Sequence, residues 1–113
     1  MELEIFQTKN INSQLVNKHK NMEPEVIHEK ENERFVIYSE GNEVYVEYSM
    51  IGNKINLYHT YTNPALRGKG LAALVVRAAL EFAKENNLKI IPTCSYVQSF
   101  IAKNDEYKEL VIE

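Results

Sequence analysis

The most constraining feature of the chain is a glycine-containing loop that joins a strand-like segment to the longest helical pattern. The loop reads Arg67-Gly68-Lys69-Gly70-Leu71-Ala72, and the turn Asn63-Pro64-Ala65 precedes it. Glycine lacks a Cβ, so the backbone can approach a ligand closely. The helix that follows directs its unpaired N–H groups and its positive dipole end at the loop. These features predict an anion site, most naturally for phosphate. A plain surface turn with two glycines is an equally good interpretation of the loop alone.

Three phosphate-binding patterns compete for this loop. The Walker pattern fails, because leucine follows the second glycine where lysine is required. The dinucleotide fingerprint G-x-G-x-x-G/A fits residues 68–73, but the next strand-like segment, residues 88–93, offers no carboxylate for a ribose. The third pattern, R-x-x-G-x-A, is satisfied by Arg67, Gly70 and Ala72. It is similar to the pyrophosphate-binding loop of the GNAT acetyltransferases.

Composition excludes several other classes of protein. A chain of 113 residues is sufficient for one domain with a real core. The net charge of −3 argues against a nucleic-acid-binding surface, and no apolar run is long enough for a membrane span or a signal peptide. The single cysteine, Cys94, cannot form an internal disulfide, which favours a reducing, cytoplasmic location. Three scattered histidines show no metal-ligand spacing, so we expect no metal site.

The periodicity divides the chain into an N-terminal segment, residues 1–25, and a domain, residues 26–113. In the first segment, a short strand around Leu3 and Ile5 and a helix through residues 11–16 are possible, but a partly disordered arm fits equally well. From residue 26 onward, short strands alternate with turns. Residues 43–51 alternate cleanly between apolar and polar side chains, as in a half-buried antiparallel strand.

The sequence pattern in the second half of the domain predicts a strand–loop–helix–strand unit. After a hairpin at residues 52–53, a strand spans residues 54–61, with Ile55, Leu57 and His59 on one face. A helix then runs from about residue 68 to 86, with an apolar face broad enough to pack on a sheet and on a neighbouring element.

A short buried strand and a second helix from Ser95 complete the pattern. The unit must form a crossover between two parallel strands, which gives an α+β domain: an antiparallel meander, then a β-α-β crossover and a C-terminal helix. The carboxyl ends of the parallel strands, at His59–Tyr61 and Pro92–Cys94, are expected beside the glycine loop.

Several separated motifs, in order, resemble one very small, single-domain branch of the GNAT family, the YjdJ-type proteins. They are His59-Thr60, Pro64, the loop at 67–72, and Pro92-Thr93-Cys94-Ser95-Tyr96, with Val26-x-His28, Arg34-Phe35 and Tyr107-x-x-Leu110 at the ends. The resemblance covers roughly residues 26–112. Members of this branch commonly carry an acidic residue and then valine after His-Thr, where this chain has Tyr61 and Thr62.

The resemblance implies a fold whose two parallel strands splay apart to admit the pantetheine arm of acetyl-coenzyme A. The backbone N–H groups of Gly68 to Ala72 would bind the pyrophosphate, with Arg67 and Lys69 as basic neighbours. The backbone of Thr60 and Tyr61 would run beside the pantetheine. The implied activity is acetyl-CoA-dependent N-acetyl transfer to an amine of a small molecule or a protein. A coenzyme A-binding module without significant catalysis is the alternative.

Two side chains are candidates for the chemistry. Cys94 precedes a predicted helix N-terminus, where a thiolate is favoured. It could accept the acetyl group, act as acid or base, or simply pack as a small buried residue. In the branch that the chain resembles, a cysteine at this place is the usual catalytic candidate. His59 could deprotonate an amine, since its unperturbed pKa lies near neutrality, although a hydrogen-bonded core histidine is an equal alternative. Tyr96 could protonate a leaving thiolate or pack, and neither the acceptor nor the oligomeric state follows from the sequence.

Overall fold

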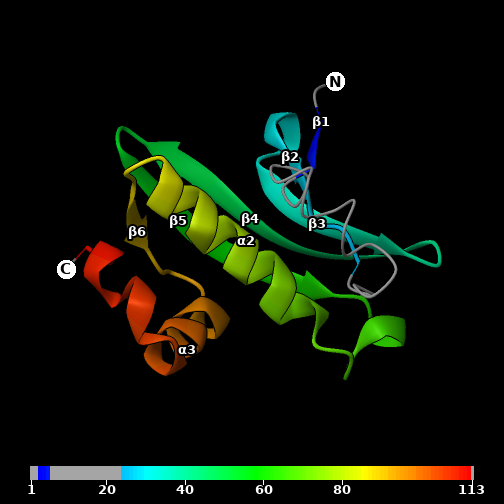
Figure 1. Cartoon of the computed structure of the whole chain (residues 1–113). Helices are drawn as coiled ribbons and strands as arrows, with labels where there is room; N and C mark the ends of the chain where they lie inside the picture. The colour runs from blue at the N-terminus through cyan, green and yellow to red at the C-terminus, as the bar shows by residue number, and fades with distance from the viewer. Residues whose placement is uncertain (1–2, 6–23, 113) are drawn as a thin grey trace, which may run out of the picture.

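The computed structural model describes residues 3–5 and 24–112 of the chain. They form one six-stranded sheet in which the strands lie in chain order (Figure 1). The strands are β1 (Leu3–Ile5), β2 (Ile27–Glu29), β3 (Arg34–Ser39), β4 (Asn42–Ile51), β5 (Lys54–Thr62) and β6 (Lys89–Ile91). The helical elements are η2 (Lys30–Asn32), η3 (Pro64–Leu66), α2 (Leu71–Glu85), α3 (Ser95–Lys103) and η4 (Asp105–Leu110). The segment of residues 11–16, for which a helix and a disordered arm were both open, lies outside the described residues.

The pairing of the strands confirms the α+β arrangement expected from the sequence. Strands β1 to β5 pair antiparallel with their neighbours, so they form the meander. Strands β5 and β6 pair parallel, with Lys54 opposite Lys89 and Asn56 opposite Ile91. This parallel ladder covers only the first residues of β5, so β6 leaves the remainder of β5 without a paired neighbour on that side.

Helix α2 begins at Leu71, three residues later than the sequence pattern indicated. The expected start at residue 68 is wrong because Gly68 and Gly70 have positive φ angles of 80° and 75°. This left-handed conformation cannot continue a right-handed helix. The loop is therefore non-helical up to Gly70, which is the N-cap of the helix.

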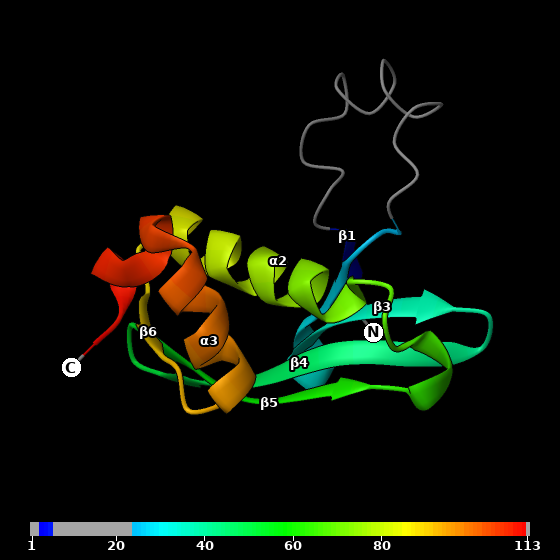
Figure 2. The ribbon, with the colours of Figure 1, turned by 90° about the horizontal axis from the view of Figure 1, so that it is seen from below.

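The broad apolar face of α2 packs on the sheet, as its width predicted. Figure 2 shows α2 and α3 on the same face of the sheet, and α2 contacts β3, β4 and β5 as well as α3 and η4. Tyr107 of η4 is fully buried, and its hydroxyl donates a hydrogen bond of 2.5 Å to Glu81 of α2. No helix in the described part of the chain is long and apolar enough to cross a membrane. We call the face covered by α2 and α3 the inner face, and the opposite one the outer face.

A β-bulge in the β4–β5 pair changes which side chains face the helices. Tyr48 lies opposite Leu57, but Glu47 lies opposite His59, so Tyr58 is an extra residue in β5. One extra residue reverses the inside–outside alternation of the strand beyond it. Thr60 therefore lies opposite Val46 on the inner face, whereas His59 lies on the outer face. The expectation that His59 shares a face with Ile55 and Leu57 is wrong for this reason.

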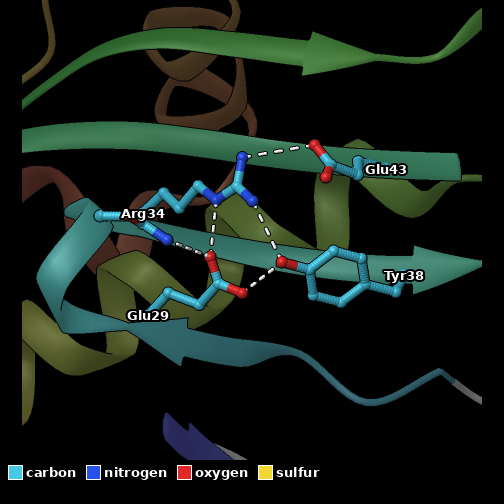
Figure 3. Close-up of polar contacts among 5 residues, drawn as sticks. Glu29, Arg34, Tyr38 and Glu43 are labelled. Carbon is cyan, nitrogen blue, oxygen red and sulfur yellow. Dashed lines mark hydrogen bonds and ion pairs between the residues drawn. The ribbon is translucent and has the colours of Figure 1, made fainter. Parts of the chain in front are cut away.

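The outer face carries a polar network that links β2, β3 and β4 (Figure 3). Arg34 donates through Nε to Glu29 at 2.8 Å and through Nη1 to Glu43 at 3.3 Å. The hydroxyl of Tyr38 also donates to Glu29, and Asn32 donates to the same carboxylate at 2.9 Å. Glu29 is only 4% exposed. A carboxylate that is buried to this extent is stable only with such partners.

Burial alone would raise the pKa of Glu29, but the hydrogen bonds from Tyr38, Asn32 and Arg34 and the charge of Arg34 outweigh it and lower the pKa below 4.5.

Candidate functional site

The glycine loop surrounds a cavity of about 300 Å³. Of the predicted loop residues, all but Lys69 line it, namely Arg67, Gly68, Gly70, Leu71 and Ala72. Thr62 from β5, Leu66 from η3 and Tyr96 from α3 complete the lining. Lys69 is exposed beside the cavity. The loop thus faces an open space between β5, α2 and α3.

The start of α2 suits this cavity to an anion. Its first turn carries no acidic residue, and its N-cap, Gly70, has no side chain that could bond the first N–H groups. These N–H groups and the positive end of the helix dipole are therefore available to a ligand. Gly68 and Gly70 line the cavity, and a Cβ added at either would meet no atom within 4 Å. This geometry fits the phosphate-type ligand predicted from the sequence.

Cys94 lies at the point where β5 and β6 separate. Its backbone N–H donates to the carbonyl of Leu57 at 3.0 Å. Leu57 directly follows Asn56, the last residue of β5 that pairs with β6. Its Sγ lies 3.6 Å from Oγ1 of Thr60. Cys94 is also the N-cap residue of α3, as the sequence predicted, although its thiol makes no formal capping hydrogen bond.

The surroundings of Cys94 favour its ionised form. Burial raises the pKa of the thiol, but the N–H of Val97, the hydroxyl of Thr60 and the N–H of Tyr96 oppose burial and outweigh it. The pKa of Cys94 is therefore lowered from its ordinary value of 9.0. A thiol with a lowered pKa and partial exposure is more reactive than a buried structural cysteine.

His59 lies on the face of the sheet opposite the helices. Its ring is 6.2 Å from that of Tyr45, which in turn is 5.3 Å from the ring of Tyr61. Glu47 is its direct cross-strand neighbour. The structure thus places the two predicted chemical groups at one end of the strands but on different faces, because the Tyr58 bulge turns His59 outward.

One feature of the site escaped the sequence patterns: the hydroxyl of Thr60, for which only a backbone role was expected, contacts Cys94. The bulge that brings Thr60 inward leaves no signal in the sequence. Tyr96, which the sequence offered as a proton donor or a packing residue, lines the loop cavity and is 38% exposed. Within the described residues, no cluster of metal-ligating side chains is present.

The described architecture defines a class of protein. An antiparallel meander is followed by a crossover to a parallel strand, and the two parallel strands pair only at one end. A glycine loop and the N-terminus of the crossover helix lie where these strands separate. This combination is a GNAT-like fold, in agreement with the sequence resemblance.

Comparisons with known proteins agree with this class. Residues 34–110 match the model of the GCN5-related N-acetyltransferase family. Protein NATD1 of Danio rerio is 33% identical over 92 residues, covering 77% of this chain and 84% of that protein. Protein NATD1 of Homo sapiens is 33% identical over 82 residues, covering 70% and 73%.

A similar solved structure is the NMR solution structure of a GCN5-like protein from Staphylococcus aureus. It is 33% identical and has a TM-score of 0.52, covering 71% of this chain and 81% of that one. The chain belongs to the GCN5-related N-acetyltransferase family.

Proposed function

We propose that the protein transfers an acetyl group from acetyl-coenzyme A to an amine. The observation that carries this proposal is the position of the anion cavity and the thiol along one face of β5. Thr62 lines the cavity, and Thr60, two residues earlier on the same face, contacts Cys94. Alternate residues of a strand are about 6.6 Å apart. A pyrophosphate at the loop would therefore leave a pantetheine arm to run along the unpaired edge of β5 toward Cys94.

The residues of the loop would hold the donor, and the residues near Cys94 would serve the transfer. The N–H groups of the loop and of the first turn of α2 suit the pyrophosphate, with Arg67 at the cavity wall and Lys69 in the solvent beside it. The backbone of Thr60 and Tyr61 lies on the edge of β5 that β6 leaves unpaired. A bound thioester would supply the activated acetyl group.

The reaction needs two proton transfers. A carbon–nitrogen bond forms, the carbon–sulfur bond of the thioester breaks, the amine loses a proton and the departing sulfur gains one. Cys94 could relay these protons. Alternatively, its thiolate could attack the carbonyl, expel coenzyme A and pass the acetyl group to the amine. In the second route the acetyl group is briefly bonded to Sγ of Cys94. Intact-mass measurement detects this acetylated form of the protein.

The acceptor belongs on the outer side of the strand opening in this proposal. A primary amine of a small molecule or of a protein is protonated at neutral pH, and it must lose a proton before it attacks. His59, with Glu47 directly opposite, is a base within that region. A coenzyme A-binding module without catalysis is the second candidate, and the separation of His59 from Cys94 on opposite faces is the observation that favours it.

Acetyl-coenzyme A is expected to raise the melting temperature of the protein, because it binds only the folded state. At a concentration about 100 times Kd, the gain in unfolding free energy is about 2.7 kcal/mol. NADH is expected to give no shift, because residues 88–93 offer no carboxylate for a ribose. Replacing Gly70 with valine should abolish the shift, since Gly70 lines the cavity and a bulkier residue there would obstruct the ligand. Differential scanning fluorimetry measures each case.

Gly52→Val is the matched control. Gly52 has a positive φ of 60° in the β4–β5 hairpin, and an added Cβ there also meets no atom within 4 Å. Both variants therefore carry similar backbone strain, but only Gly70 lies at the cavity. The proposal fails if acetyl-coenzyme A stabilises neither the parent nor Gly52→Val, or if it stabilises Gly70→Val as strongly as the parent.

A further inference from the structure

The hydroxyl of Thr60 and the thiol of Cys94 are brought together by backbone pairing. Thr60 lies within the β4–β5 ladder, opposite Val46. Cys94 is fixed by the hydrogen bond from its own N–H to the carbonyl of Leu57. Both residues are thus held by backbone hydrogen bonds to strands of the sheet, which fixes the 3.6 Å separation between Oγ1 and Sγ.

The bulge at Tyr58 is what selects Thr60 for this contact. Without the extra residue, the alternation of β5 would continue from Leu57 to His59 on the inner face, and Thr60 would point outward. With it, the inner face presents a hydroxyl to Cys94, and the imidazole lies on the other face, against Tyr45. A hydroxyl in this position can donate a hydrogen bond to a thiolate.

We propose that Thr60 is the positioning residue of Cys94, donating its hydroxyl to Sγ when the thiol is ionised and holding the sulfur at the opening between β5 and β6. This inference rests on the proposed function, in which Cys94 is the reactive group. Thr60 acts through Cys94 and does not itself exchange protons with the substrates.

The hydrogen-bonding groups around Cys94 make this role testable. Besides burial, the groups that shift its pKa are the N–H groups of Val97 and Tyr96 on α3 and the hydroxyl and N–H of Thr60 on β5. These groups are all uncharged. The hydroxyl can be removed by substitution, whereas the backbone N–H groups remain in every variant. A difference in the pKa of the thiol between a variant and the parent therefore measures the effect of the hydroxyl.

The experiment compares Thr60→Val with Thr60→Ser. Valine matches threonine in shape but lacks the hydroxyl, and serine keeps it. Iodoacetamide modifies Cys94, the single cysteine of the chain, and intact mass gives the rate from neutral to alkaline pH. In Thr60→Val the apparent pKa should rise by about half to one unit, and the rate at neutral pH should fall by about 3- to 10-fold. Thr60→Ser should follow the parent profile.

The inference is overturned if the valine and parent profiles coincide, or if serine shifts the profile as much as valine does. Thr60→Ala, which removes the hydroxyl without adding a branched side chain, provides the same comparison if the valine variant does not fold. The labelling is measured without acetyl-coenzyme A. A parent that labels as expected but transfers no acetyl group would therefore contradict the proposed function and leave the role of Thr60 standing.

Discussion

Cys94→Ser is expected to lower the rate of acetyl transfer per folded molecule by a factor of ~10²–10⁴, the usual cost of removing a general acid, base or nucleophile. Serine is close in size to cysteine, but its hydroxyl does not ionise near neutral pH. The affinity for acetyl-coenzyme A should be retained, because Cys94 is not among the residues that line the loop cavity. Turnover and acetyl-coenzyme A binding are to be measured at equal folded fraction with a broad panel of amines.

Two further variants make this comparison decisive. Ser99→Ala changes an exposed residue of the same helix, α3, and should have normal turnover. His59→Gln tests the outer face, because a severe loss there would mean that the amine is deprotonated on that side of the sheet. Near-normal turnover in both Cys94→Ser and His59→Gln would show that this end of the strands is not the catalytic site. A parent that acetylates no amine would support the binding-module alternative.

Arg34→Met is expected to destabilise the protein by about 3 kcal/mol, because it leaves Glu29 buried without its cationic partner. The side chains of Arg34 and Glu29 are 16% and 5% exposed in this ion pair. By contrast, Lys108→Met removes an ion pair with Asp105 in which the side chains are 55% and 84% exposed. That control should cost about 0–1 kcal/mol. Urea unfolding monitored by circular dichroism gives both values.

The effect of Arg34→Met should depend on pH in a defined direction. The pKa of Glu29 is lowered in the folded protein, so the ionised network stabilises the fold above the ordinary glutamate pKa of 4.5. This contribution is lost as the pH falls through the lower folded-state value. The difference between parent and variant should thus be full at neutral pH and should shrink in acid. A difference that stays constant from neutral to acidic pH would show that Glu29 is not ionised in the network.

Much of the fold is predictable from local patterns, because those patterns have local causes. The alternation of residues 43–51 predicted β4, and the broad apolar face predicted that α2 packs on the sheet. The two glycines marked the loop between β5 and the helix, although the predicted helix start at about residue 68 was three residues too early. The position of Cys94 directly before α3 was also visible, since the serine that follows is a favourable helix start.

Other parts of the site depend on contacts that no local pattern reveals. Residues 55–59 alternate as an ordinary strand would, so the bulge at Tyr58 and the outward position of His59 could not be predicted. Glu29 looks like a solvated strand residue, yet Arg34 and Tyr38 bury it. His28 of β2 is only 1% exposed; it stacks on Phe35, and its Nε2 is bonded to the Tyr48 hydroxyl.

The short parallel ladder has a consequence for the order in which the molecule assembles. The meander joins strands that are neighbours in the chain, whereas the contact between Thr60 and Cys94 spans 34 residues. Closing so long a loop costs more conformational entropy than closing a hairpin, so such contacts form slowly. Strand β6 has only three residues, so we expect it to separate from β5 at a lower free energy than the strands of the meander separate from one another. Such a partial opening would dismantle the site around Cys94 before the protein unfolds globally.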